Sequence, residues 1–309
     1  MPATIAVMGA GPAARHHLLG LVRSPHCDRV VLAAPDSPDR SELYRRFGII
    51  KALHDEYSAA LAGPDVNIVD VCAPITEREA IIREALEAGK HVVTAAPFAT
   101  NADASEALAQ QAASSNLRLL PVLYQRFIPA NARVKQLLSE SAIGAPIFGG
   151  ITRITPQSDE PEAPAILQDG FHAVELLQHY FGPAQAGSAT TNPTGSLALL
   201  TLQLPEGVLG QVNIIAAATG DHPSTERRLV GTEGSLLVRD NPEDELPLIA
   251  FQSEEAFPIR VKNHPDVVEY AVMESLEHLL QCLATSTPEE TTAAQATAAL
   301  LTIKNSKPQ

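Results

Sequence analysis

The sequence predicts an α/β chain in which a doubly wound parallel sheet precedes an α+β domain built on a mostly antiparallel open sheet. Three observations carry this prediction. A glycine-rich turn joins the first apolar run to the first helical segment. Apolar runs then alternate with helical periodicity over about the first 120 residues. The later part of the chain is a succession of apolar runs with no helices between them, flanked by helical segments.

The stretch from Thr4 to Leu19 is predicted to form a strand, a tight turn and a helix. Gly9 can adopt the positive φ of a sharp turn, and Gly11 lacks the Cβ that would keep a pyrophosphate away from the backbone. Amide groups at the helix start would face that phosphate. The residues of this G-x-G-x-x-A fingerprint are Gly9, Gly11, Pro12, Ala13 and Ala14. A turn that only redirects the chain is the alternative, and the following apolar run favours the fingerprint.

The remaining elements of the first domain follow in order. We expect helices over 13–23, 39–47, 55–62, 77–88 and 101–115, and strands over 29–34, 49–53, 66–72, 91–94 and 117–123. Right-handed crossovers between parallel strands place ligand at the carboxyl ends of the strands. The residues expected there are Gly9 to Ala14, Asp36, Ala73, Pro74, Ala95, Ala96, Pro97, Tyr124, Gln125 and Arg126.

Asp36 is the candidate acid for the adenosine ribose, because it follows the second predicted strand. Its alternative is an ordinary turn residue, since Asp-Ser-Pro is typical turn chemistry. An acid at this position favours NAD slightly over NADP. Ser37 and Arg40 are the alternative, as residues that hold a 2′-phosphate, so both cofactors stay open.

The periodicity changes after about residue 122, which divides the chain into a dinucleotide-binding domain, 1–122, and a substrate and oligomerisation domain, 123–309. We expect helices over 129–139, 166–180, 267–284 and 289–304, and strands over 146–155, 186–191, 196–204, 208–216, 226–231, 234–239 and 247–252. The stretch 155–164 is predicted to be a surface loop. The last helix is allowed to pack back on the first domain.

Composition narrows the functional class. The formal charge of −14 argues against sequence-independent nucleic-acid binding and against acidic membranes, since both need a basic surface. The cysteines, Cys27, Cys72 and Cys282, are too scattered for a disulfide framework or a zinc motif and are expected in the core. No secretory signal or membrane span is evident. We therefore expect a cytoplasmic protein that acts on a small molecule.

The sequence resembles the glucose-fructose oxidoreductase and inositol dehydrogenase family, written Gfo/Idh/MocA. The resemblance begins with the fingerprint and its trailing His17 and covers nearly the whole chain. It continues through VDVCAP (69–74), EALEAGKHVV (84–93), YQRFIPANARVKQLLSESAIGAPIFG (124–149), DGFHAVELLQHYFG (169–182) and GTEGSLLV (231–238). It implies NAD or NADP as cofactor, a small-molecule substrate, and a homo-oligomer formed through the C-terminal sheet.

The chain departs from that family at its chemical positions. The family's fifth strand usually ends in Glu-Lys-Pro, and the matching residues here are Ala95, Ala96 and Pro97, so the lysine position is Ala96. Alanine can neither donate a proton nor hold an oxyanion. Arg78 stands where the family often has a histidine.

The family's histidine on the substrate-domain helix is matched by His172, whereas its aspartate four residues earlier is Gln168. Asp169 lies one place off, and one residue turns a helical side chain by about 100°. His172 is therefore the candidate proton donor or acceptor, assisted by Tyr124, Arg126 or Gln168. A structural histidine is the alternative.

A metal site is not predicted. His172, Glu175 and His179 lie at i, i+3 and i+7, but no second source of ligands is evident, so a solvated or domain-facing stripe is expected. His16 and His17 are assigned to the first helix and to a domain contact. The resulting hypothesis is an NAD(P)-dependent oxidoreductase acting on a polyol, a sugar-derived compound or another small carbonyl compound. The alternative is a catalytically degenerate relative that senses a nucleotide or small ligand.

Overall fold

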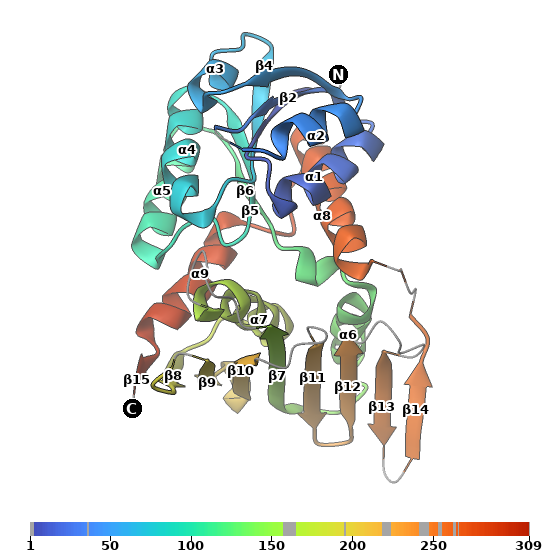
Figure 1. The fold of residues 1–309 in the computed structure, drawn as a ribbon. Helices are drawn as coiled ribbons and strands as arrows, with labels where there is room; N and C mark the ends of the chain where they lie inside the picture. The colour runs from blue at the N-terminus through green and yellow to red at the C-terminus, as the bar shows by residue number, and fades with distance from the viewer. Residues whose placement is uncertain are drawn as a thin grey trace. The chain divides into compact units, whose positions relative to one another are not determined.

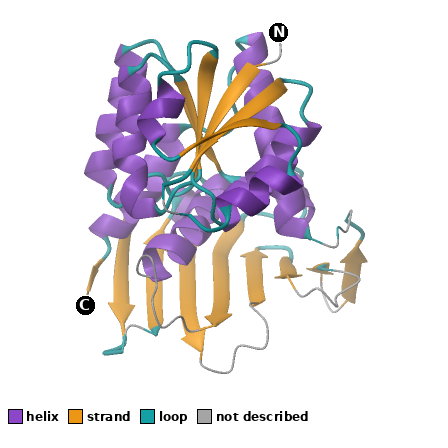
Figure 2. Cartoon of the chain, turned by 45° about the horizontal axis from the view of Figure 1, so that its top comes forward, coloured by secondary structure: helices purple, strands orange, loops and turns teal. Residues whose placement is uncertain are grey.

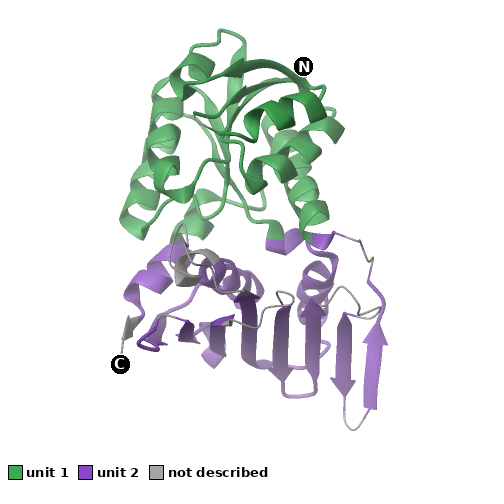
Figure 3. Ribbon diagram, viewed as in Figure 1, with its two compact units in different colours: residues 1–124, 268–297 green, residues 125–267, 298–309 purple. Residues whose placement is uncertain are grey.

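The computed structural model describes residues 3–35, 37–156, 165–194, 196–217, 224–240, 247–252, 255–261, 264 and 266–308. The chain divides into two compact units, drawn in green and purple in Figure 3. Unit 1 comprises Met1–Tyr124 and Val268–Thr297, and unit 2 comprises Gln125–Val267 and Ala298–Gln309. No helix among the described residues is both long and apolar enough to cross a membrane.

Unit 1 is built on a six-stranded parallel sheet with the order β3-β2-β1-β4-β5-β6. Its strands are β1 (Ala3–Met8), β2 (Cys27–Ala33), β3 (Ile50–His54), β4 (Val66–Val71), β5 (His91–Ala95) and β6 (Leu119–Val122). The connecting helices are α1 (Pro12–Arg23), α2 (Arg40–Arg46), α3 (Tyr57–Leu61), α4 (Ile75–Glu87) and α5 (Ala102–Ser114). This confirms the predicted doubly wound fold, in which the chain runs outward from β1 in one direction and from β4 in the other (Figure 1).

The strands of unit 1 are apolar because both faces of the sheet are covered. All six residues of β1 are buried, as a continuous hydrophobic strand in a parallel sheet requires. On one face the core extends to helix α8 (Val267–Thr285), which contributes Val272, Leu276, Leu279 and Leu280 to the cluster formed by β1, β2 and α1. Residues 268–297, which the sequence boundary at 122/123 assigns to the second domain, therefore group with unit 1.

Unit 2 is built on a nine-stranded sheet with the order β14-β13-β12-β11-β7-β10-β9-β8-β15. Its strands are β7 (Pro146–Pro156), β8 (Ala186–Thr191), β9 (Leu197–Gln203), β10 (Leu209–Ala217), β11 (Ser224–Gly231), β12 (Ser235–Asp240), β13 (Leu248–Gln252), β14 (Glu255–Ile259) and β15 (Lys307–Pro308). The pairs β7–β10 and β8–β15 are parallel and the other pairs are antiparallel, which confirms a mostly antiparallel sheet (Figure 2).

One face of this sheet packs against helix α7 (Ala165–Phe181). Gly149 of β7 and Gly210 of β10 lie against α7, where a Cβ would approach the side chain of Leu177. Along β9, Leu200 and Leu202 are buried while the intervening residues are exposed, as the sequence alternation predicts. Helix α6 (Pro129–Ser139), the end of α9 (Ala293–Asn305) and two short 3-10 segments, η1 (Tyr124–Phe127) and η2 (Pro205–Gly207), complete the unit.

Some elements differ from those expected. Strands β14 and β15 were not expected, helix α9 starts at Ala293 and not at 289, and helix α4 starts at Ile75, two residues before the predicted start, directly after Pro74. Proline fixes the entry to this helix because it is tolerated at a helix start but not in a helix interior. The predicted loop 155–164 lies mostly outside the described residues, since β7 runs to Pro156 and α7 begins at Ala165.

Candidate functional site

The turn between β1 and α1 has the backbone that the fingerprint requires. Gly9 has a φ of 106°, and a Cβ on it would lie 2.7 Å from the backbone nitrogen of Ala73. Around Gly11, by contrast, no described atom lies within 4 Å of the position a Cβ would occupy. The space above Gly11 is therefore open, while the space behind Gly9 is filled by the end of β4.

The start of α1 leaves backbone donors available to a ligand. Gly11 is the N-cap residue and gives the helix no side-chain cap, and Pro12 occupies the first helical position, where its missing N–H costs nothing. Ala14 is fully buried, so the helix packs closely on the sheet there. Open space over Gly11 and an uncapped helix start fit the pyrophosphate of a dinucleotide.

His17, three residues after Ala14, makes a contact that the sequence analysis did not foresee. Its Nδ1 lies 2.8 and 3.0 Å from the two carboxylate oxygens of Asp70 on β4, and both side chains are buried. The Cys72 thiol donates to Asp70 Oδ1 at 3.7 Å, and burial followed by the Asp70 charge raises the pKa of that thiol well above its usual range. The contact between His17 and Asp70 joins α1 to β4 within unit 1.

Among the described residues, His17, Asp70 and Cys72 form a group whose side chains are of the types that bind metal ions. One ligand atom from each of His17, Asp70 and Cys72 lies within 4.8 Å of the others, and all three residues are buried. His17 and Asp70 already contact each other directly, as an ion pair or a hydrogen bond, without a metal ion between them. The three cysteines are buried free thiols, as expected for core residues.

The carboxyl ends of β4 and β5 carry Ala73, Pro74, Ala96 and Pro97, four of the residues predicted for cofactor binding. Arg78 of α4 reaches this edge and bonds to backbone carbonyl oxygens there. Alanine at position 96 offers no side-chain donor or acceptor, so the polar side chain at this edge comes from α4.

At the carboxyl end of β2, the adenosine side, Asp36 lies outside the described residues. Arg40 Nη1 donates to the carbonyl oxygens of Ala34 at 3.2 Å and His54 at 3.4 Å. Arg40 also forms an ion pair with the exposed carboxylate of Asp55. Its guanidinium thus joins the ends of β2 and β3, although the sequence analysis had offered it as a 2′-phosphate ligand.

The 3-10 segment η1 follows β6 and carries Tyr124, Gln125 and Arg126. Tyr124 is half-buried against the core of unit 1. Gln125, in unit 2, is buried, and Asn131 Nδ2 donates to its backbone oxygen at 2.7 Å and to its Oε1 at 3.2 Å. These bonds fix the turn at the start of unit 2.

Arg126 forms a buried ion pair with Glu175 of α7. The guanidinium donates to Glu175 Oε1 from Nε, at 2.7 Å, and from Nη2, with side-chain exposures of 8% and 1% for the arginine and the glutamate. Burial raises the pKa of Glu175, and Arg126 opposes that rise. Of the two expected surroundings, solvated or domain-facing, the solvated one is wrong for Glu175, because its charge-paired partner from η1 covers it.

Helix α7 also carries the other substrate-side candidates. His172 is half-buried and its ring meets Phe171 edge-on, with centroids 5.2 Å apart. The side chain of Gln168 lies outside the described residues. Asp169, which follows it, accepts a hydrogen bond from Arg153 Nε of β7 at 2.6 Å, so this carboxylate joins α7 to β7. His172 and Glu175, three residues apart, share one face of the helix.

His179, one turn after Glu175, is held neutral by its surroundings. Burial, followed by the charges of Arg126 and Lys135, lowers the pKa of this imidazole to about 3. Lys135 of α6 donates from Nζ to the backbone oxygens of His179 at 2.7 Å and Tyr180 at 3.2 Å, at the end of α7. A cation at this position satisfies terminal carbonyls and complements the helix dipole.

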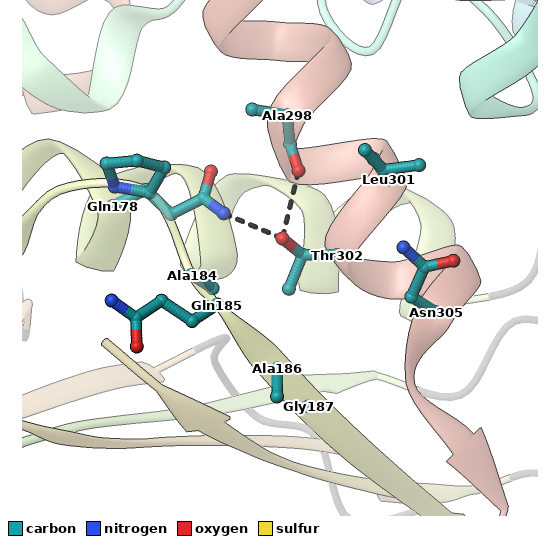
Figure 4. A pocket seen from close by; sticks show the side chains of 10 residues that line it. Gln178, Ala184, Gln185, Ala186, Gly187, Ala298, Leu301, Thr302 and Asn305 are labelled. Carbon is teal, nitrogen blue, oxygen red and sulfur yellow. Dashed lines mark hydrogen bonds between the residues drawn. The ribbon is translucent and has the colours of Figure 1, made fainter. Parts of the chain in front are cut away.

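A separate cavity of about 170 Å³ lies in unit 2, where the end of α7 faces β8 and the end of α9 (Figure 4). Gln178 Nε2 donates to Thr302 Oγ1 at 2.8 Å, and Thr302 donates to the Ala298 oxygen at 2.9 Å, which closes one side of the cavity. None of the residues predicted for catalysis or cofactor binding lines it.

Comparison with known proteins agrees with the fold and with the fingerprint. Residues 3–122 match the family described as "Oxidoreductase family, NAD-binding Rossmann fold". Levoglucosan dehydrogenase of Pseudarthrobacter phenanthrenivorans is 24% identical over 270 residues, which cover 74% of this chain and 69% of that protein.

Solved structures share the fold over almost the whole chain. An oxidoreductase from Agrobacterium radiobacter, in complex with NAD⁺, L-tartaric acid and magnesium, superposes with a TM-score of 0.86 at 16% identity, over 98% of this chain and 95% of that one. Biliverdin reductase from Synechocystis, in complex with biliverdin and NADP⁺, superposes with a TM-score of 0.83 at 18% identity, over 99% of both chains. Among these two structures of the same fold, one contains NAD⁺ and the other NADP⁺.

Proposed function

We propose that the chain is a member of the Gfo/Idh/MocA oxidoreductase family, whose model matches residues 3–122, and that it oxidises or reduces a small polyol, a sugar-derived compound or another small carbonyl compound with NAD(P) as hydride carrier. The observation that carries the proposal is the fingerprint turn, where Gly9 is packed against β4 and the space over Gly11 is open. It lies on β1, beside β4, where the strand order reverses and dinucleotides bind.

Different residues of unit 1 would bind different parts of the cofactor. The turn residues Gly9 and Gly11, with the amides of Ala13 and Ala14, would hold the pyrophosphate. The edge formed by Ala73, Pro74, Ala96 and Pro97 would lie at the nicotinamide half. The bound cofactor supplies hydride transfer at its nicotinamide ring. Gln125, the first residue of unit 2, is also proposed for cofactor binding.

We propose NAD in preference to NADP. Arg40, the residue that would pair with a 2′-phosphate, is already bonded to the carbonyl oxygens of Ala34 and His54 and paired with Asp55. A second negative charge beside the Asp55 carboxylate would be unfavourable. Asp36 at the end of β2 is the proposed partner of the ribose hydroxyls.

We propose His172 as the group that gives or takes the proton at the reacting oxygen, because imidazole titrates near neutral pH. The proposed role of Arg126 is to orient an oxygen through the N–H donors of its guanidinium. Tyr124 and Gln168 are the proposed assisting residues. The buried bond from Arg126 to Glu175 supports this role, since it fixes the direction of the guanidinium.

A screen of polyols, sugars and their carbonyl counterparts, followed by absorbance of the reduced nicotinamide, tests the function. Turnover by the wild-type chain, lost in His172→Gln and kept in His264→Gln, a half-buried histidine that is no candidate site residue, is the expected result. Absence of turnover with every compound, despite dinucleotide binding, would contradict it.

A second function, ligand or nucleotide sensing by a degenerate site, is favoured by Ala96 and Gln168. Neither residue can replace the charged group usual at its position. A sensing protein would bind a dinucleotide and a small ligand without consuming either. Calorimetric binding of both, with unchanged nicotinamide absorbance over prolonged incubation, would support this function over the first.

A further inference from the structure

Arg78 of α4 is bonded to the carboxyl edge of two neighbouring strands of unit 1. Arg78 Nε donates to the backbone oxygen of Ala73 at 2.8 Å. Its Nη1 donates to the oxygen of Pro97 at 2.6 Å and lies 3.4 Å from the oxygen of Ala95. The guanidinium is thus bonded to the carboxyl ends of two neighbouring parallel strands, β4 and β5, on either side of Ala96.

These bonds hold the guanidinium in one place. The three acceptors are backbone oxygens, at the end of β4, the end of β5 and the residue after Ala96, so none can rotate away as a carboxylate side chain can. Ala95 O also accepts from Thr94 Oγ1 at 3.1 Å, which anchors the edge further. A cation fixed in advance acts on a ligand without the cost of being oriented on binding.

The charges adjacent to Arg78 on α4 are directed to other partners. Glu77 accepts from the Tyr57 hydroxyl at 3.1 Å. Glu79 Oε1 accepts from the backbone nitrogen of Thr100 at 2.8 Å and from its hydroxyl at 2.6 Å. The charge of Arg78 is felt at the end of β4, where it opposes the rise in the pKa of the Cys72 thiol that burial and Asp70 cause.

The position of this charge relative to a dinucleotide follows from the topology. The fingerprint after β1 and the end of β2 take the pyrophosphate and the adenosine ribose. The second half of the sheet, β4 to β6, is left for the nicotinamide mononucleotide. Arg78 therefore belongs to the nicotinamide half, whose oxidised ring is a cation and whose reduced ring is neutral.

We propose that Arg78 sets the balance between oxidised and reduced cofactor, by placing a fixed positive charge at the carboxyl edge of β4 and β5. This inference rests on the proposed dinucleotide site. A fixed cation disfavours the positively charged oxidised ring and leaves the neutral reduced ring little affected. The protein should therefore bind NADH more tightly than NAD⁺, and bound NAD⁺ should be a stronger hydride acceptor than free NAD⁺.

The test is the ratio of dissociation constants for NAD⁺ and NADH, measured by titration calorimetry on the full chain without substrate. Arg78→Gln should tighten NAD⁺ binding relative to NADH by about fivefold or more, from the Coulomb energy of two charges near a protein surface. Arg83→Gln, an equal charge change at an exposed position of the same helix, should leave the ratio unchanged.

Two further variants separate the effect of the Arg78 charge from the effect of its hydrogen bonds to the ends of β4 and β5. Arg78→Lys keeps the charge but loses the planar fork, so the ratio should stay near the wild-type value even if both cofactors bind less tightly. Ala96→Lys keeps every bond of Arg78 and adds a cation to the same edge, so the ratio should shift further toward NADH.

The inference is overturned if Arg78→Gln and Ala96→Lys both bind the cofactors with the wild-type ratio, or if Arg78→Lys changes the ratio as much as Arg78→Gln. If Arg78→Gln fails to fold, Ala96→Lys alone decides between these outcomes. A wild-type chain that binds neither form contradicts the proposed function itself, so the two failures are distinguishable.

Discussion

At the scale of single residues, Arg126 and Glu175 form an ion pair in unit 2 whose two side chains are both buried. The arginine donates twice to Glu175 Oε1, while Glu175 Oε2 is buried and accepts no hydrogen bond from the described residues. Buried ion pairs are costly to break because one charge is left without its partner. The pair therefore specifies where η1 meets α7.

Glu175→Gln should lower the free energy of unfolding by about 3 kcal/mol, because the buried guanidinium of Arg126 then loses the carboxylate that Glu175 supplies. Urea unfolding followed by circular dichroism measures this change. Asp169→Asn is the matched control, since its pair with Arg153 is more exposed and should cost about 1 kcal/mol or less. Equal costs for the two variants would mean that burial does not strengthen the first pair.

His179 should make the protein sensitive to acid. The unfolded histidine binds its proton below about pH 6.5, whereas the folded imidazole does so only near its pKa of about 3. Between these values the unfolded state binds more protons, so stability falls as pH falls. At pH 5 this group alone should lower the free energy of unfolding by about 2 kcal/mol relative to neutral pH.

His179→Gln removes this titration, and its stability should therefore decline less between pH 7 and pH 4 than that of the wild type. Denaturant unfolding at several pH values gives both curves. Parallel curves for the two proteins would show that the imidazole is not protected from protonation in the folded state.

At the scale of elements, the turn between β1 and α1 has separate requirements at its two glycines. Gly9 has to be glycine because its φ is 106° and the end of β4 occupies the position of a Cβ. Gly11 has a φ of −74°, which any residue adopts, and no described atom lies near its Cβ position. The fold therefore requires glycine at position 9, whereas no described residue requires it at position 11, where the proposed dinucleotide would.

Gly9→Ala should destabilise unit 1 by at least about 2 kcal/mol, since the new Cβ meets the backbone of Ala73 and the conformation is strained. Thermal unfolding without cofactor measures the effect. An unchanged melting temperature would show that the turn relaxes without cost, and the strand-to-helix geometry would then not depend on this glycine.

Most elements are predictable from the sequence because their periodicity is local. The burial of every residue of β1 and the alternation along β9 follow from the pattern of apolar residues alone. The pairs of His17 with Asp70 and of Arg126 with Glu175 were not predictable in this way. They join residues 53 and 49 positions apart, and the packing of one element on another, rather than any local pattern, decides such contacts.

At the scale of the whole molecule, unit 2 presents large apolar side chains on its surface. Leu209 of β10 is 57% exposed, and Leu199 of the neighbouring strand β9 is also exposed, on the same face of the sheet. Exposed apolar residues grouped on one surface are typical of association sites. They agree with the proposal that the C-terminal sheet forms a homo-oligomer.

Sedimentation equilibrium should therefore give a mass of at least two chains for the wild type, and Leu209→Glu should shift the mass toward one chain. The substitution lies on an exposed position, so it should not change the melting temperature of an isolated chain. A wild-type protein that sediments as a single chain at high concentration would contradict the proposed assembly.

The central claim, that the glycine-rich turn holds a dinucleotide, is tested most directly by Gly11→Ala. The affinities for NAD⁺ and NADH are measured by titration calorimetry beside Gly48→Ala, a control whose added methyl also meets no described atom. We predict that both variants melt like the wild type and that only Gly11→Ala loses dinucleotide affinity, by about tenfold or more, since its Cβ enters the pyrophosphate site. Unchanged affinity in Gly11→Ala would contradict the account.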